Sequence, residues 1–595
     1  MNAATLPEAS VTAGVPEPIE PVRFDVSDLD KDGDPRVDLD AFVNARWRAR
    51  NPVPADRSCW DAFAVLTERT LAIEAAIAEA AAASEARPGT PERIVGDFWT
   101  SGLRGDPDDA PLRAELARID RLDSHEAIAD YIRDRHARGL GVVFRLDVEP
   151  DFDAPEQTIA YVSQGGLGLP DRDDYFDTTS QGLARRRAYV AHVAAMLGLV
   201  GCDASLADEM LAFETELAAA SISRRELARD IAARFRPVDL DTADRATPHF
   251  PWGEFFRTLG ITPPQRFSLA MPQFFAAFDS ALAPTPPSSP RKRGPSACGG
   301  TSVSVWRAYF AFHTIDAAAP FVGPALELQH HDFHRRTLRG QKAIAPRWRR
   351  VVEAIDAHAA EAMGRLYVAR CFPAESKREV EAIAENLRAA FRERLESLDW
   401  MSEATCRAAL RKLSALRFRI GHPERWRDWS SLVTSPRSLY ANVLAARAFE
   451  QRERVARIGR RTDPTRWTVP PQAVNARYDP QRNEVVFPAA MLAPPFFDPA
   501  ADAALNYGGI GAVIAHETTH AFDDQGSRFG PNGRFENWWT AEDRARFDAL
   551  ADRVRAHFDA MPDIGGERID GRLTLGENIA DFGGLAIAFD ALAHA

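Results

Sequence analysis

The sequence predicts a mainly α-helical protein with a small strand-containing region near residue 480. Apolar residues recur at steps of three and four through long stretches of the chain, which is the periodicity of an amphipathic helix. Two short β-like runs stand at residues 473–478 and 484–487. A chain of 595 residues is also long enough for two or more domains, each with its own core.

The helical pattern follows a leader at residues 1–22, which is rich in Pro, Glu and Ala and is expected to be disordered. A first helix is predicted over residues 60–77, where apolar residues fall near helical spacing. A longer helix is predicted over residues 380–398, with Ser376 and Glu379 as a capping box at its start. Its apolar stripe is expected to lie in the core: Val380, Ile383, Leu387, Phe391, Leu395 and Leu398.

Residues 284–300 interrupt the helical pattern with a run of Pro, Ser and Gly, so we expect an inserted, exposed loop. Its Arg291-Lys292-Arg293 triplet could be a localisation or nucleic-acid patch, but three charges in a loop are usually only solvated. We favour the inserted loop.

The strand-like runs at residues 473–478 and 484–487 flank a turn-rich link, residues 479–483. Residues 506–509 then lead into a helix whose Ile510, Val513 and Ile514 are expected to pack inward. A strand edge beside a helix with functional side chains is an arrangement in which an extended peptide can pair with the strand.

That helix carries His516-Glu517-Thr518-Thr519-His520. Two imidazoles four residues apart lie on one face of a helix, about 6 Å apart along its axis, so both can reach one ion. A zinc ion that does chemistry has three protein ligands and one open position. Glu577, 57 residues after His520, is the predicted third ligand, and one zinc ion per chain is expected.

Four carboxylates have predicted roles around this ion. Glu517 is predicted to act as the general base that takes a proton from a zinc-bound water. Asp581 lies four residues after Glu577 and is expected to accept a hydrogen bond from a ligating imidazole. We therefore predict a catalytic role for Asp581 as well as for Glu517. Asp523 is expected to do the same for the other imidazole, with Asp524 as the adjacent alternative. The pattern indicates a zinc peptidase, although two surface histidines on a helix would give the same pentapeptide.

Other motifs are weaker. Residues 28–39 resemble a calcium loop, but Leu39 stands where a Glu is needed and Pro35 disturbs the loop. His330, His331 and His334 have metal-like spacing without a recognisable carboxylate partner, so we interpret them as a helix surface. The glycines of residues 165–168 lack the strand–helix context of a dinucleotide site and indicate a turn.

Composition restricts the partners. A formal charge of −13 argues against nucleic acid and gives little attraction to an anionic membrane. The five scattered cysteines, without a Cys-x-x-Cys pair, predict reduced thiols. The first 25 residues show no signal sequence, and no run of about 18 apolar residues could span a membrane. A cytoplasmic protein is therefore expected; export to the periplasm or the medium would require a start further upstream.

Several segments together resemble the neprilysin family, the zinc endopeptidases that include endothelin-converting enzyme and bacterial oligopeptidases. The segments are residues 42–47, 168–173, 398–402, 474–478, 487–497, 506–524, 537–540 and 573–581. The resemblance implies two lobes: a large helical one and a thermolysin-like catalytic lobe with a small β-sheet. Residues 23–455 would form mainly the helical lobe, with residues 23–58 packing on the catalytic lobe, which would comprise residues 456–595.

The resemblance also implies site residues and a substrate class. His516, His520 and Glu577 would bind zinc, with Glu517 as base and Asp523 and Asp581 bonded to the imidazoles. Asn475 and Ala476 would hold the substrate backbone. The pocket for a hydrophobic side chain would be lined by Met491, Phe496 and Val513. Substrates would be oligopeptides cut on the amino side of hydrophobic residues.

The chain departs from the family pattern at three places. The loop 284–300 would be a tolerated insertion into the helical lobe. Arg477 stands where the family usually has an aromatic residue, which would alter preference near the edge strand. Nothing matches the family's last several tens of residues, which carry a His and an Arg that grip the substrate and stabilise the oxyanion. The alternatives to an active endopeptidase are therefore a catalytically impaired zinc- or peptide-binding remnant and, less consistent with the combined motifs, a helical scaffold with incidental histidines.

Overall fold

The computed structural model describes residues 20–104, 108–284, 300–563, 566 and 568–595. The leader predicted for residues 1–22 lies outside this part of the chain except for its last three residues. The predicted loop 284–300, with Arg291, Lys292 and Arg293, lies outside it except for its two ends. Among the described residues Cys59, Cys202, Cys371 and Cys406 are free thiols, as predicted.

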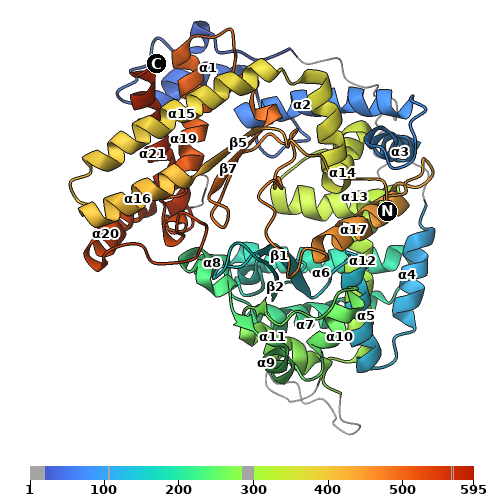
Figure 1. Cartoon of the computed structure of the whole chain (residues 1–595). Helices are drawn as coiled ribbons and strands as arrows, with labels where there is room; N and C mark the ends of the chain where they lie inside the picture. Colours follow the sequence, from blue (N-terminus) through green and yellow to red (C-terminus); the bar gives the residue numbers. More distant parts are fainter. Residues whose placement is uncertain (1–19, 105–107, 285–299, 564–565, 567) are drawn as a thin grey trace.

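The structure is mainly helical and has two lobes (Figure 1). The lower lobe in Figure 1 surrounds one large aromatic-rich core. Its elements are α4 (Ala110–Asp120), α5 (His125–Ala137), β1 (Phe144–Pro150), β2 (Thr158–Gln164), α6 (Ser180–Leu199), α7 (Ala207–Ala220), α8 (Arg224–Arg229), β3 (Pro237–Val238), α9 (Leu240–Ala246), α10 (Trp252–Thr258), β4 (Phe267–Leu269), α11 (Pro272–Leu282), α12 (Val303–Val322), α13 (Pro324–His331) and a π-helix, Asp332–Thr337. The strand order in its sheet is β1-β2-β4-β3.

The upper lobe contains two adjoining cores, and Phe372 and Val474 pack against both. One core is formed mainly by helices at the upper right of Figure 1: α2 (Ala62–Ala82), α3 (Pro91–Arg104), α14 (Arg347–Cys371) and α17 (Leu439–Val455). The other contains a second sheet and the metal motif: α15 (Ala374–Ser397), α16 (Glu403–Ala415), β5 (Arg417–Gly421), β6 (Arg477–Asp479), β7 (Glu484–Pro488), α18 (Ala503–Asn506), α19 (Ala512–Thr519), α20 (Ala541–Asp559) and α21 (Leu575–Leu592). The two-lobed, mainly helical fold with small sheets is the one expected.

The predicted division between residues 455 and 456 does not coincide with these cores. Helices α15 and α16 pack in the same core as α19, and β5 pairs in parallel with β7 of the metal-site sheet. Residues 23–58, which include helix α1 (Leu39–Arg50), also contact the upper lobe. Arg23 forms an ion pair with Asp498, and Asp56 forms one with Arg349. The compact unit around the motif therefore draws on both halves of the chain.

Helix α15 confirms the apolar stripe, since Val380, Ile383, Leu387, Phe391 and Leu395 are all buried, and Leu398 packs against them at the helix end. The capping box predicted at Ser376 is wrong. The helix begins earlier, after Pro373, and Ser376 lies inside its first turns. The fixed φ of proline allows it to precede a helix without a side-chain cap.

The predicted strand pair is a hairpin in which Tyr478 opposes Val485. The third strand, β5, comes from a remote part of the sequence and places β7 in the centre, so the order is β5-β7-β6. Strand β6 is therefore a free edge beside the motif helix.

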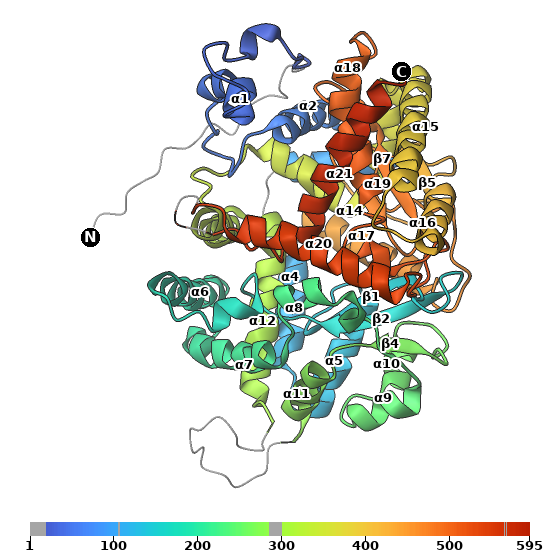
Figure 2. The ribbon, with the colours of Figure 1, turned by 90° about the vertical axis from the view of Figure 1, so that its left-hand side faces the viewer.

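Helices α19 and α21 pack closely against each other (Figure 2). A Cβ atom added to Gly584 would lie 2.7 Å from the backbone nitrogen of His516, and one added to Gly583 would lie 2.7 Å from the Thr519 side chain. These contacts hold Glu577, two turns earlier on α21, opposite the histidines. No described helix is both long and apolar enough to cross a bilayer.

We expect Gly584→Ala to separate α21 from α19, because the new methyl group would overlap with backbone that cannot rotate away. The free energy of unfolding in urea should fall by about 1–3 kcal/mol, a usual cost of overpacking, and zinc affinity should fall with it. Gly198→Ala is the matched control, since a Cβ there meets nothing within 4 Å. Unchanged stability and zinc affinity in Gly584→Ala would contradict this account of the helix contact.

Candidate functional site

The motif helix is positioned by its apolar face. A π-helical turn, Tyr507–Gly511, leads into α19, and Ile510 and Ile514 are fully buried beneath it. Burial of that face turns His516 and His520 toward α21 and the edge strand. Gly509 allows this close packing, because a Cβ there would lie 2.4 Å from the carbonyl oxygen of Phe496.

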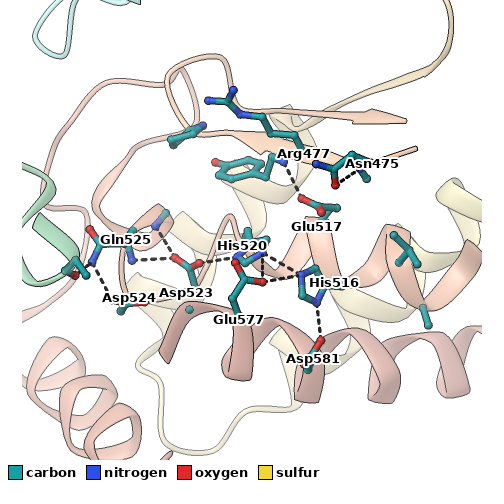
Figure 3. A pocket seen from close by; sticks show the side chains of 18 of the residues that line it. Asn475, Arg477, His516, Glu517, His520, Asp523, Asp524, Gln525, Glu577 and Asp581 are labelled. Carbon is teal, nitrogen blue, oxygen red and sulfur yellow. Dashed lines mark hydrogen bonds and ion pairs between the residues drawn. The ribbon is translucent and has the colours of Figure 1, made fainter. Parts of the chain in front are cut away.

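His516, His520 and Glu577 converge from two helices (Figure 3). The two Nε2 atoms are 3.1 Å apart, and Oε2 of Glu577 lies 3.3 Å from the Nε2 of His516 and 3.6 Å from that of His520. The ligand atoms of a tetrahedral zinc ion, with bonds of 2.0–2.2 Å, are about 3.3 Å apart. These three atoms therefore have the chemistry and the spacing of a zinc site.

The outer nitrogens of both imidazoles are held by carboxylates. Nδ1 of His516 lies 2.9 Å from Asp581, and Nδ1 of His520 lies 2.7 Å from Asp523. Asp523 in turn accepts backbone N–H bonds from Gln525 and Gly526. These contacts fix Nε2 of each ring as the atom that faces the ion. They place Asp523 and Asp581 as predicted, whereas the described contacts of Asp524 include the Gln525 side chain and neither imidazole.

The charges around the triangle favour a cation. Burial opposes protonation of His516, but Asp581 and Glu577 outweigh it and raise the pKa of His516 to about 9. Burial is likewise outweighed at His520, whose pKa rises to about 10 beside Asp523 and Glu577. Hydrogen bonds from the two imidazoles hold the pKa of Glu577 below its ordinary value. A divalent ion would replace these protons and satisfy the same carboxylates.

Glu517 lies on the other side of the imidazoles, toward the edge strand. Its Oε2 accepts a hydrogen bond of 2.8 Å from the backbone N–H of Tyr478 in β6. Its carboxylate also lies within 4.8 Å of the ligand atoms of His516 and His520. Burial raises the pKa of Glu517, which makes the carboxylate a better proton acceptor.

A cavity of about 920 Å³ opens over this cluster. Of the predicted substrate residues, Asn475, Ala476 and Val513 line it. Met491 and Phe496 do not, because both are buried in the core. Phe63 also packs on Phe496, with ring centres 4.5 Å apart. The cavity's apolar lining thus includes three residues that the sequence analysis did not assign to the site, Phe63, Leu573 and Leu585.

Lys412 of α16 is a further residue that the sequence analysis missed. It is fully buried, and its Nζ donates to the carbonyl oxygens of Gly526 and Phe529 at 2.6 and 2.7 Å. Burial lowers its pKa to about 7. Lys412 thereby holds the loop that presents Asp523 to His520. A lone lysine within a helix gives no sequence signal for such a role.

Comparison with known proteins identifies relatives over nearly the whole chain. Two sequence models, both described as peptidase family M13, match residues 35–423 and 475–594. Endothelin-converting enzyme 1 of Mus musculus is 27% identical over 586 residues, which span 95% of this chain and 74% of that protein.

Solved structures are similar to this chain over nearly its whole length. The zinc metalloprotease ZMP1 of Mycobacterium tuberculosis in complex with an inhibitor superposes with a TM-score of 0.88 at 33% identity, covering 96% of this chain and 87% of that one. The open state of ZMP1 gives a TM-score of 0.73 over 94% of this chain and 87% of that one. The arrangement of this chain is therefore nearer to the inhibitor complex than to the open state.

We expect Asp581→Asn to weaken zinc binding by about 10–100-fold, because the amide no longer provides a negative partner for the His516 ring. Competition with a chromophoric chelator would measure the affinity. Asp590→Asn, on the same helix and paired with Arg394, is the control and should bind zinc like the parent. Equal affinities in both variants would contradict the role given to Asp581.

Proposed function

Given that the chain belongs to peptidase family M13 and is a zinc metalloendopeptidase, we propose that it hydrolyses oligopeptides on the amino side of hydrophobic residues, with Glu517 as the general base. The observation that carries this proposal is the triangle of His516, His520 and Glu577 with the Glu517 carboxylate beside it. The family match also favours hydrolysis over the non-catalytic alternatives considered from the sequence.

The chain's own residues supply binding and proton transfer. Zinc, when bound, would polarise the scissile carbonyl group and lower the pKa of the attacking water. Glu517 would take the proton from this water and deliver it to the departing amine. The raised pKa of Glu517 suits both steps, because the carboxylate must accept the proton and then release it.

The edge strand β6 supports binding of an extended peptide. It ends the sheet order β5-β7-β6, and the residues around it, Asn475 to Tyr478, line the cavity over the histidines. A substrate could add to this edge through backbone hydrogen bonds, with Asn475 and Ala476 at its start. Arg477 is exposed there and would favour an acidic side chain nearby on the substrate.

The apolar part of the cavity supports the preference for a hydrophobic residue. Val513 is one turn before His516 on α19, and Phe63 and Leu585 add apolar surface from α2 and α21. A substrate side chain placed against them would leave water, and each buried methylene group contributes about 0.8 kcal/mol.

Replacement of Glu517 by Gln should lower kcat by roughly 10²–10⁴-fold, because the amide cannot accept the proton, while zinc content stays that of the parent. Cleavage of a quenched fluorescent peptide would be followed with and without a chelator. Glu542→Gln, exposed at the start of α20, is the control and should keep full activity. Equal, chelator-insensitive rates in both variants would refute the proposed reaction.

A peptide series that varies only the residue after the scissile bond tests specificity. We expect kcat/KM to fall about tenfold or more from Leu to Ala, because the apolar contacts are lost. Val513→Ala should reduce this ratio, whereas Val433→Ala, on an exposed loop, should leave it unchanged. Mass spectrometry of the products would locate the cut. A series cleaved at equal rates, Asp included, would overturn the hydrophobic preference.

A further inference from the structure

A second cluster of histidines and a carboxylate lies in the other lobe. His192 of α6, Asp316 of α12 and His334 of the π-helix Asp332–Thr337 bring one ligand atom each within 4.8 Å of the others. The Nε2 of His192 lies 3.0 Å from Oδ1 of Asp316, and the Nε2 of His334 lies 3.0 and 3.1 Å from its two oxygens. Three separate elements thus point Nε2, Nε2 and a carboxylate at one place.

The surroundings fix the rings in this arrangement. Phe333 stacks on His192 with ring centres 4.6 Å apart, and the side-chain amide of Gln329 lies 3.2 Å from the outer nitrogen of His192. A metal-bound histidine donates this second N–H to an oxygen, which Gln329 would supply with its amide group turned over. The π-helical turn that carries His334 is a rare backbone form that is frequently found at functional sites.

A third imidazole lies beside the cluster. The ring centres of His330 and His334 are 4.4 Å apart. A divalent ion at the cluster would bind its histidines as neutral imidazoles and Asp316 as an ionised carboxylate.

We propose that His192, Asp316 and His334 bind a second divalent transition-metal ion, for which zinc is the default. The donor set of two imidazoles and one carboxylate is the same as at the catalytic triangle. The nitrogen–oxygen separations of 3.0–3.1 Å are close to the roughly 3.3 Å expected between zinc ligands. Asp316 and His334 are partly exposed, which gives an ion access, whereas His192 is buried and fixes one corner.

A hydrogen-bonded trio without metal is the competing interpretation, and the contact of Gln329 with His192 is compatible with both. Without metal, the Nε2–H of His192 donates to Asp316, and Nδ1 accepts from the Gln329 amide nitrogen. With metal on Nε2, the proton moves to Nδ1, and the oxygen of Gln329 must face it. The heavy-atom positions serve both states, since the two ends of an amide differ only by their hydrogen bonds.

The role of this ion would be structural. It would join α6, α12 and the π-helix after α13 within the lower lobe. The catalytic triangle lies in the upper lobe (Figure 1). Sequence alone shows only His330, His331 and His334. His192 and Asp316 come from other helices, and His331 instead contacts the carbonyl oxygen of Ala343.

Metal counting in the full chain tests this proposal. The double variant His516→Ala/His520→Ala removes the catalytic site, so any remaining site-bound metal reports the second one. After dialysis against cobalt(II), we expect one equivalent by elemental analysis, with visible absorption bands of a low-symmetry site. Adding Asp316→Asn should abolish both, whereas adding His249→Gln should not, because His249 and Asp279 form a surface pair without a second imidazole partner among their described contacts.

The outcomes separate this proposal from the proposed function. No cobalt in a folded double variant, or cobalt retained after Asp316→Asn, would overturn the second site and leave the peptidase assignment untouched. Circular dichroism would verify folding. If Asp316→Asn does not fold, His334→Gln carries the same test, because that side chain is 24% exposed and tolerates replacement better. In the parent chain, two equivalents of metal are expected, and a single one would count against the proposal.

Discussion

The predicted zinc site depends on the close approach of two helices that lie far apart in the sequence. His516 and His520 come from α19, and Glu577 comes from α21, so the metal triangle exists only while these helices touch. Gly583 and Gly584 permit that contact, since a side chain at either would overlap with α19. A bound ion would connect helices whose packing already places its ligands, so less of the binding free energy would be lost in ordering them.

Local pattern was sufficient to predict the parts of the site that lie near each other in the chain. The histidine pair, the α15 stripe and the β6–β7 hairpin all follow from short-range spacing, and the structure contains each of them. The roles of Asp523 and Asp581 follow from helical geometry relative to their neighbours. The resemblance to zinc endopeptidases added the cavity residues Asn475, Ala476 and Val513 and the two-lobed fold.

Features that arise from distant contacts were beyond prediction. Strand β5, the buried Lys412, and Phe63 at the cavity wall all reach the site from elsewhere in the chain. The expected pocket residues Met491 and Phe496 lie in the core instead, and Phe63 packs on Phe496. The second histidine cluster shows the same limit: spacing revealed three histidines on one segment, but only the fold brings Asp316 and His192 to one of them.

The hydrogen bond between Glu517 and the backbone of Tyr478 links the binding of a peptide at β6 to the position of the Glu517 carboxylate. The same edge strand that would receive a peptide also holds Glu517, the proposed base, in place. A slip of one residue in β6 would turn every side chain to the opposite face and remove the amide that Glu517 uses. Substitutions in this strand that change substrate choice would therefore also alter the pKa and the orientation of the Glu517 carboxylate. Selectivity and turnover would then change together.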